Sequence, residues 1–388
     1  MKLLIFEWGG GTYTYNDLVE SFSYQGITYR TVSYKFDDKN DDDFFEYRFS
    51  KVLEDGYDAV FSVNFFPLVA KCCDRAGIKY IAWSYDCPMD VPDLEKTFGL
   101  SCNHIFLFDR SQVKKYRDMG FDNVEHMPLA VNCRRLDAIK ITPKDIREYS
   151  SDISFVGKMY DSMYSDFLRL MDDYCKGYIE AVMAAQSKVF GYYMIDDMLT
   201  DDIMRRINDH IAKLPDNTSG FMLPKEALSY AMASEVTRGD RIIILHILSK
   251  RYKLNFYSWD MCELLTDVHY RGSCNYPDQQ PRVFRLSKIN LNITLRILQS
   301  GIPLRALDIL GSGGFLLSNY QPELAEFFVD GSEVVMYESV EDAIEKAIFY
   351  LNNDDLRARI ARNGHDKAKE QFSFDVQLGK MFKASGLI

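Results

Sequence analysis

Short apolar segments alternate with helical patterns through the first third of the chain, and this alternation restricts the fold more than any other feature. The apolar segments are typical of strands and cover residues 3–6, 28–32, 59–63, 79–83, 104–108 and 124–127. The helical patterns between them cover residues 15–25, 44–53, 67–76 and 111–119. Strands that alternate with helices form a parallel sheet covered on both faces. We therefore expect an α/β fold with a Rossmann-like domain over residues 1–146.

A second series of strands follows, and it carries more helix than a parallel sheet requires. Its predicted strands cover residues 152–156, 254–257, 268–270, 289–293, 315–317 and 334–337. Helical patterns stand between the first two of these strands, at residues 179–189, 202–211, 225–233 and 240–248. We expect a second Rossmann-like domain over residues 147–371, with a helical insertion near residues 161–250. Two such domains that face each other make a cleft, and ligands of parallel sheets bind beyond the carboxyl ends of the strands.

The composition argues against several partners and compartments. A chain of 388 residues with a net charge of -11 and no concentrated Lys/Arg stripe lacks the positive footprint that nucleic acids and anionic lipid surfaces require. Glu7 interrupts the apolar run at the N-terminus, so this run predicts a buried strand and not a signal peptide. No window approaches the roughly 20 apolar residues of a membrane span. The eight cysteines form no CxxC pair, which favours reduced thiols and a cytoplasmic protein.

Residues 287–345 contain the pattern that points most directly to a ligand. Asn290 and Asn292 alternate with apolar residues, so the predicted strand has one polar face. Pro303 marks the first turn of a short helix, and Arg305 lies one turn before Asp308 on that helix. A helix N-terminus beside strand ends offers unpaired amides and a positive potential. This combination suits a diphosphate and a sugar hydroxyl.

The same stretch resembles a known family. The resemblance rests on Arg305-Ala-Leu-Asp308, the glycines Gly311, Gly313 and Gly314, Pro322-Glu323-Leu, the segment from Gly331 to Tyr337, and residues 354–364. These motifs resemble the C-terminal domain of the CgeB-like, or spore-maturation-type, glycosyltransferases. That family is part of the GT-B clan, which uses nucleotide sugars. The resemblance covers roughly the last third of the chain.

The resemblance implies a fold and a division of labour. A GT-B protein has two Rossmann-like domains, of which the second holds the nucleotide sugar and the first holds the acceptor. Residues 372–388 would form a C-terminal helix that returns to the first domain. The sequence departs from the broader clan at one point, because Ser300 and Asp308 stand where the common pattern has two glutamates. Whether the reaction retains or inverts the anomeric configuration is therefore left open.

Several candidate donor contacts follow from this picture. Gly157 and Lys158 follow a strand, and the lysine could neutralise charge on the leaving diphosphate. Met159 stands where a Walker motif needs Ser or Thr, which argues against a P-loop nucleotidase. Arg305 could clamp the diphosphate, and Asp308 could accept hydrogen bonds from ribose hydroxyls. The alternative for Lys158 is a surface lysine in a turn, and the alternative for Arg305 and Asp308 is an i,i+3 ion pair on a helix surface.

Two further groups could also contact the donor. Lys288, Asn290 and Asn292 occupy the polar face of the predicted strand, where they either bind ligand or satisfy neighbouring loops. Tyr257 and Trp259 follow another strand, and their rings could stack on a nucleobase. Packing in the core is the alternative for these aromatic residues.

Candidate acceptor contacts lie at two strand ends of the first domain. Trp8, Gly9, Gly10 and Gly11 follow the first strand, and the glycines allow the backbone to approach a ligand closely. They do not form GxGxxG, so the dinucleotide fingerprint of an NAD enzyme is absent from this loop. Asp86 ends a strand immediately before Cys-Pro, where it could act as general base or position the acceptor. A turn-stabilising aspartate is the alternative.

We interpret the sequence as a glycosyltransferase that moves a sugar from a nucleoside-diphosphate sugar to a hydroxyl of a protein, glycan or cell-surface component. The reaction is expected to need no metal and no cofactor besides this co-substrate, because the Asp-rich loop at residues 37–43 is a solvated charge run and not a strand-end Asp-x-Asp site. The helical insertion could serve dimerisation or acceptor recognition. The alternatives are a sugar-nucleotide epimerase or hydrolase on the same fold, and a non-catalytic carbohydrate-binding partner.

Overall fold

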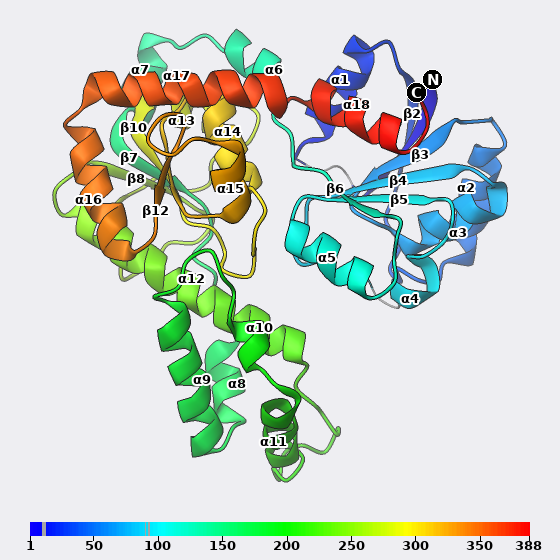
Figure 1. Cartoon of the computed structure of the whole chain (residues 1–388), viewed down its shortest axis with the longest axis horizontal. Helices are drawn as coiled ribbons and strands as arrows, with labels where there is room; N and C mark the ends of the chain where they lie inside the picture. Colours follow the sequence, from blue (N-terminus) through cyan, green and yellow to red (C-terminus); the bar gives the residue numbers. More distant parts are fainter. Residues whose placement is uncertain (10–12, 90, 92–93) are drawn as a thin grey trace. The chain divides into compact units, whose positions relative to one another are not determined.

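The computed structural model describes residues 1–388 except 10–12, 90 and 92–93 (Figure 1). The chain forms two compact units. The first comprises Met1–Lys140, Ser300–Gly311 and Asp366–Ile388, and the second comprises Ile141–Gln299 and Ser312–His365. The segment Ser300–Gly311 groups with the first unit by its contacts, whereas the sequence pattern placed it in the second domain.

The first unit is built on a six-stranded parallel sheet with the order β2-β1-β3-β4-β5-β6. Its strands are β1 (Lys2–Trp8), β2 (Thr28–Tyr34), β3 (Ala59–Val63), β4 (Lys79–Ser84), β5 (Asn103–Leu107) and β6 (Val124–His126). Its helices are α1 (Tyr15–Tyr24), α2 (Asp43–Leu53), α3 (Pro67–Ala76), α4 (Leu94–Thr97), α5 (Arg110–Asp118), α6 (Cys133–Ala138), α14 (Leu304–Gly311) and α18 (Phe374–Ala384).

Local sequence signals explain where these helices begin and end. Pro67 occupies the first turn of α3, and Gly77 ends that helix in the left-handed conformation at φ +64°. The carboxylate of Asp109 caps α5 by accepting a hydrogen bond from the backbone N–H of Ser111 (2.8 Å). Strand, helix and cap therefore follow one another as the alternating pattern predicts.

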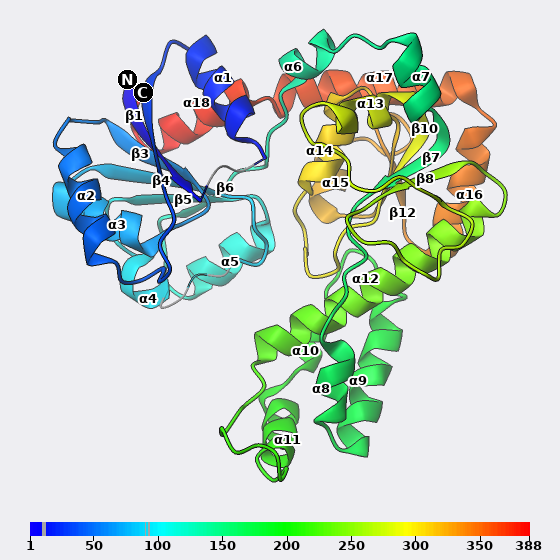
Figure 2. The ribbon, with the colours of Figure 1, turned by 180° about the vertical axis from the view of Figure 1, so that it is seen from behind.

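Aromatic side chains fill both faces of this sheet. On one face the ring of Phe6 packs against those of Phe45 and Phe66, with centroids 5.5 and 5.0 Å away. On the other face Phe61 contacts Phe22 of α1 (5.7 Å), and Phe22 also contacts Phe382 of α18 (6.2 Å). The C-terminal helix α18 thus packs beside α1, as both ribbon views show (Figures 1 and 2).

The second unit is built on another six-stranded parallel sheet, with the order β12-β11-β10-β7-β8-β9. Its strands are β7 (Ser151–Val156), β8 (Leu254–Tyr257), β9 (His269–Tyr270), β10 (Ser287–Asn292), β11 (Leu316–Asn319) and β12 (Val335–Tyr337). Its helices are α7 (Pro143–Tyr149), α8 (Tyr164–Arg169), α9 (Asp173–Gln186), α10 (Ile195–Met198), α11 (Asp201–Ile211), α12 (Lys225–Ser249), α13 (Gln279–Leu286), α15 (Pro322–Phe327) and α16 (Val340–Leu351). The helix α17 (Asp354–Gln371) runs across the boundary of the two units.

The helix α12 corrects one sequence prediction. Separate helices were predicted at residues 225–233 and 240–248, but Lys225–Ser249 form one continuous helix. Thr237, in the predicted gap, is fully buried and its hydroxyl donates to the carbonyl of Ala233 (2.7 Å). Burial along the helix outweighs the cost of about 1 kcal/mol that Gly239 adds inside a helix. Tertiary packing therefore overrides the local break.

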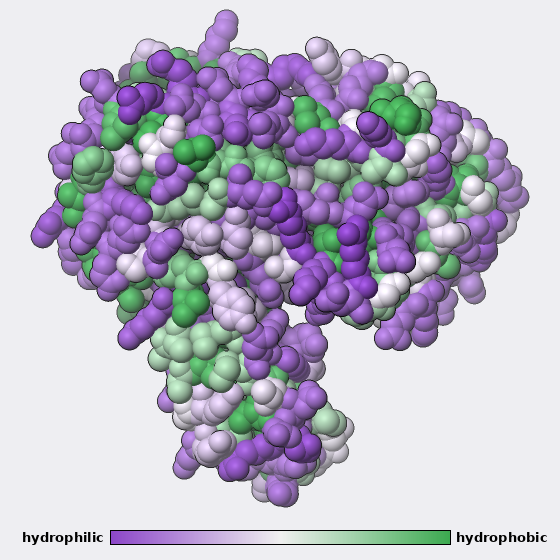
Figure 3. All heavy atoms as spheres, viewed as in Figure 1, coloured by the Kyte–Doolittle hydropathy of each residue, from purple (hydrophilic) through white to green (hydrophobic). Residues whose placement is uncertain are grey.

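The helix α12 also belongs to two apolar cores. Its first half carries Leu228 and Met232, which pack with α8, α9, α10 and α11. Its second half carries Ile244, Leu245 and Leu248, which pack on the sheet core. In the face drawn in Figure 3, apolar atoms appear as small separate patches in a mostly hydrophilic surface. Across the described residues, no helix is long and apolar enough to cross a membrane.

Candidate functional site

Arg241 of α12 joins the carboxyl ends of two neighbouring strands in the second unit. β10 pairs with β7, and the loops that follow them begin at Ile293 and Gly157. The guanidinium group donates to the carbonyl oxygen of Lys158 and, through Nε (3.2 Å) and Nη2, to that of Ile293. The ring of Tyr160 lies 4.4 Å from the guanidinium carbon. Arg241 is only 5% exposed, and this burial lowers its pKa.

A buried ion pair lies on the same helix. Asp240 Oδ2 accepts hydrogen bonds from Arg296 Nη2 (2.7 Å) and Nε (3.0 Å), and the two side chains are 5% and 7% exposed. Arg296 also donates through Nη1 to the carbonyl of Val189 and stacks on the ring of Phe190, 3.6 Å away. Burial raises the pKa of Asp240, and the charge of Arg296 works against this shift.

Arg241, Asp240 and Arg296 together carry one positive charge in excess. Two buried guanidinium groups, those of Arg241 and Arg296, face one buried carboxylate, that of Asp240. The side chain of Lys158 is exposed and has no ion-pair partner within the described part of the chain. A buried charge without a counter-charge is costly, so the carboxyl ends of β7 and β10 favour an anion.

The remaining candidates near these strand ends differ in exposure. A side chain at Gly157 would start 3.1 Å from the ring of Phe155, so the loop passes close to the core there. Tyr257 is 4% exposed, its carbonyl accepts from the N–H of Gly157 (3.0 Å), and burial raises the pKa of its hydroxyl to about 12. Tyr257 thus packs in the core, which was the alternative to stacking on a nucleobase. The side chain of Trp259 is 71% exposed and available for stacking.

Lys288 lies at the wrong end of its strand for the proposed role. It stands near the start of β10, and its Nζ forms an ion pair with Asp152 at the start of β7 (2.8 Å). Ligands of parallel sheets bind at the opposite, carboxyl ends. We therefore remove Lys288 from the proposed donor contacts.

The two asparagines of β10 hold neighbouring backbone and hydroxyl groups. Asn290 is fully buried, and its Nδ2 donates to the carbonyls of Phe284 (2.9 Å) and Phe315 (3.2 Å). Asn292 is 5% exposed, and its Nδ2 donates to the hydroxyls of Thr294 (3.0 Å) and Ser318 (2.9 Å). These contacts favour the structural alternative, in which both residues satisfy their neighbours.

Arg305 and Asp308 lie on α14, in the first unit. Arg305 Nη1 is 3.8 Å from Asp308 Oδ2, and their side chains are 27% and 9% exposed. The segment before α14 is anchored on the cap of α5, because Ser300 Oγ donates to Asp109 Oδ1 (2.7 Å). Ser300, which replaces the first glutamate of the resembled pattern, therefore has a structural contact. The i,i+3 pair is present, and Arg305 keeps enough exposure to reach a ligand.

Asp86 follows β4 in the first unit and is held by one asparagine. Asn64 adopts the left-handed conformation at φ +67°, which is uncommon outside glycine. Its Nδ2 donates to Asp86 Oδ2 (2.6 Å), and its Oδ1 accepts from the N–H of Tyr85 (2.8 Å). Asp86 as a whole is exposed, yet packing around the carboxyl group raises its pKa, and the bond from Asn64 works against this shift.

The end of β1 contains a residue, Glu7, that the sequence motifs did not identify as a site residue. Trp8 is 42% exposed, and Gly9 has φ +70°, whereas Gly10 and Gly11 lie outside the described residues. Glu7 Oε1 is buried, and no described residue hydrogen-bonds to it. Loss of solvation raises the pKa of Glu7. A carboxylate inside an apolar strand, one residue from its end, was the signal in the sequence.

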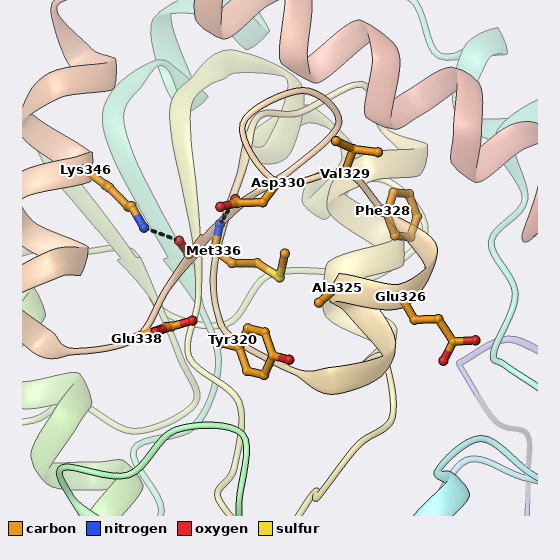
Figure 4. A pocket seen from close by; sticks show the side chains of 9 residues that line it. All are labelled: Tyr320, Ala325, Glu326, Phe328, Val329, Asp330, Met336, Glu338 and Lys346. Carbon is orange, nitrogen blue, oxygen red and sulfur yellow. Dashed lines mark hydrogen bonds between the residues drawn. The ribbon is translucent and has the colours of Figure 1, made fainter.

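A pocket of about 410 Å³ lies elsewhere in the second unit, between α15, β12 and α16 (Figure 4). None of its lining residues belongs to the Arg241 network. The edge strand β12 forms one wall of this pocket, and side chains already satisfy the backbone of its residue Met336. Asp330 accepts a hydrogen bond from the N–H of Met336 (2.8 Å), and Lys346 donates one to the carbonyl of Met336 (2.6 Å). These side chains therefore oppose the pairing of a further strand with β12 at Met336. Among the described residues, no three His, Cys, Asp or Glu side chains are grouped to hold a metal ion.

Comparisons with known proteins agree with this architecture. Residues 236–382 match the family model described as "Glycosyl transferase-like". A glycosyltransferase from Rickettsia africae is 10% identical with a TM-score of 0.57, over 100% of this chain and 98% of that chain. Anabaena HepE in complex with UDP and glucose is 8% identical with a TM-score of 0.56, over 100% of both chains. Sucrose-phosphate synthase from Thermosynechococcus elongatus is 9% identical with a TM-score of 0.55, over 100% and 99%. A sequence search against curated proteins produced no match.

The chain has the fold of the GT-B glycosyltransferases, and its residues 236–382 form a glycosyl transferase-like domain. The matched region includes Arg241, Arg296, Arg305 and Asp308.

Proposed function

We propose that the protein transfers a sugar from a nucleoside-diphosphate sugar, which the second unit binds, to an acceptor hydroxyl. The observation that carries this proposal is the excess positive charge at the carboxyl ends of β7 and β10. Asp240, Arg241 and Arg296 lie inside the glycosyl transferase-like region of residues 236–382, and β7 precedes that region. HepE was crystallised with UDP and with UDP-glucose, so UDP is the first nucleotide to test.

In the proposed reaction the acceptor oxygen attacks the anomeric carbon while the bond from that carbon to the diphosphate oxygen breaks. The nucleoside diphosphate leaves with the bonding electron pair. In the second unit, Lys158 and the field of the buried arginines stabilise the negative charge on it. Arg305 of the first unit is a further proposed contact of the diphosphate. Asp308 is proposed to hold the ribose hydroxyls.

The carboxylate of Asp86 takes the proton of the attacking hydroxyl, since its raised pKa makes it a stronger base than an ordinary aspartate. Glu7, whose pKa is also raised, is the second candidate for this base. No metal ion is needed in this scheme, because cationic side chains and the N-terminus of α14 meet the charge of the leaving group. Trp8 and Gly9 are proposed to contact the acceptor, and Trp259 to stack on the base.

Three finer assignments belong to the same proposal. The motifs around Arg305 and Asp308 support the CgeB-like subtype. The acceptor domain is proposed to comprise residues 1–146, and the donor domain residues 147–371. All eight cysteines are free thiols, which supports a cytoplasmic location.

Titration calorimetry with UDP, GDP and dTDP tests the proposal, with a chelator present throughout. We expect one nucleotide to bind, and Lys158→Ala to weaken that binding about tenfold, or ~1.4 kcal/mol. Lys288→Ala is the matched control, since it removes the same charge from the opposite end of the sheet and should leave binding unchanged. If no nucleotide binds, the non-catalytic alternative is favoured. If the sugar is released to water or epimerised in place of transfer, the hydrolase or epimerase alternative holds.

A further inference from the structure

We infer that Arg241 is a positioning residue that fixes the spacing of the two loops on which the donor diphosphate rests. The inference rests on the proposed function and extends it, because Arg241 carries no motif and is not exposed to a ligand. It acts through the backbone of Lys158 and Ile293, whose carbonyl oxygens accept its hydrogen bonds. The loop after β7 and the loop after β10 are thereby held by one side chain.

The geometry of the guanidinium group suits this role. Arginine presents five N–H donors in a planar, rigid fork, so one group can bond two carbonyls at a set separation. Nε and Nη2 of Arg241 address Ile293, and Nη1 addresses Lys158. A lysine has one nitrogen on a flexible stem and cannot reproduce both bonds with the same geometry. Arg241→Lys should therefore keep the charge and lose the spacing.

Tyr160 provides a second, independent sign that the loop after β7 is held under constraint. It is one of two described non-glycine residues with positive φ, at +55°. A residue of this kind in the left-handed region costs free energy and persists where its surroundings hold it. The ring of Tyr160 stacks on the guanidinium of Arg241, at 4.4 Å. The stacking contact and the hydrogen bond to Lys158 thus hold the same turn.

The helix α12 provides rigid support for this arrangement. The residue before Arg241, Asp240, binds the side chain of Arg296, and Thr237 one turn earlier accepts from the N–H of Arg296 (3.0 Å). Both the loop after β10 and the loop after β7 are therefore fixed to one continuous helix. Sites supported by regular elements hold their geometry better than sites on free loops. Arg241 should consequently affect binding of the donor more than turnover of the bound complex.

The test compares three variants of the full chain by calorimetry with UDP, or with GDP or dTDP if one of these binds the wild type instead. Arg241→Lys is expected to weaken nucleotide affinity about 10- to 100-fold and to raise the KM for the nucleotide sugar while kcat changes less than threefold. Tyr160→Gly should weaken affinity in the same direction with a nearly unchanged thermal midpoint, since glycine adopts positive φ without strain. Arg205→Lys is the matched control, because this arginine of α11 forms an exposed i,i+3 ion pair with Asp202 and belongs to neither loop.

The outcomes separate the two proposals. No nucleotide binding by the wild type overturns the proposed function itself. Binding by the wild type, with affinities of Arg241→Lys and Tyr160→Gly within twofold of it, leaves that function standing and overturns the positioning role. If Arg241→Lys fails to fold, Tyr160→Gly still decides, because its affinity must fall while that of Arg205→Lys stays at the wild-type value.

Discussion

Replacing Asp240 by asparagine tests the buried charge balance on which the donor site depends. Asp240 and Arg296 are 5% and 7% exposed, and two hydrogen bonds of 2.7 and 3.0 Å join them. Asp240→Asn removes the one carboxylate that offsets two buried arginines. Breaking a buried pair costs about 3–5 kcal/mol, because a charge is left uncompensated. An amide still offers one acceptor oxygen to Arg296, so we expect the lower end, about 3 kcal/mol.

Differential scanning calorimetry measures this loss. A change of 1 kcal/mol shifts the thermal midpoint of a unit of this size by about 2–4 °C, so Asp240→Asn should lower the midpoint by roughly 6–12 °C. Asp166→Asn is the control, since Asp166 and Arg169 form an exposed i,i+3 pair at 3.2 Å. Exposed pairs contribute about 0–1 kcal/mol, so this variant should shift the midpoint by less than about 4 °C.

The same variant tests the sign of the charge. Because Asp240→Asn raises the buried excess from one positive charge to two, a bound diphosphate should stabilise the variant more than it stabilises the wild type. The reasoning is refuted if Asp240→Asn costs no more than Asp166→Asn, or if saturating UDP raises the midpoint of the variant less than that of the wild type.

Three further predictions concern the first unit. Arg305→Ala should leave the thermal midpoint nearly unchanged and nearly abolish transfer of sugar from the nucleotide sugar, and normal turnover would exclude Arg305 from the donor site. Glu7→Gln should raise the thermal midpoint at pH 7, because burial raises the pKa of Glu7 and its charged form therefore opposes folding. This gain should vanish as the pH falls below the ordinary pKa of a glutamate, and a lower midpoint of the variant at pH 7 would contradict the reasoning. Gly301→Ala would place Cβ 2.8 Å from the carbonyl oxygen of Phe108 and should cost about 1–3 kcal/mol in urea unfolding, so an unchanged unfolding midpoint would show that the segment before α14 is not tightly packed.

The sequence predicts the sheets well because the spacing of apolar residues along the chain shows which side of each strand or helix is buried. β3 and α3, for example, begin and end at the predicted residues. The break predicted inside α12 is wrong, because Thr237 and Asp240 make buried contacts with Arg296, which is distant in sequence. Local patterns do not contain such contacts.

Candidate site residues are predicted less completely, for related reasons. Alternation places Lys288 on the polar face of β10 but says little about the partner it meets, and the structure pairs it with Asp152 at the amino ends of the strands. Arg241 and Arg296 belong to no motif, and only the pairing of β7 with β10 brings the loops that they hold together. A charged pair inside an apolar helical run, Asp240-Arg241, was the available signal.

The most direct test of the account compares a nucleoside diphosphate with its nucleoside, for example UDP with uridine, by titration calorimetry at low and high salt. If the excess positive charge at the ends of β7 and β10 binds the diphosphate, UDP should bind at least about 100-fold more tightly than uridine, or ~2.7 kcal/mol, and the difference should shrink at high salt. Equal affinity for UDP and uridine at low salt would contradict the account.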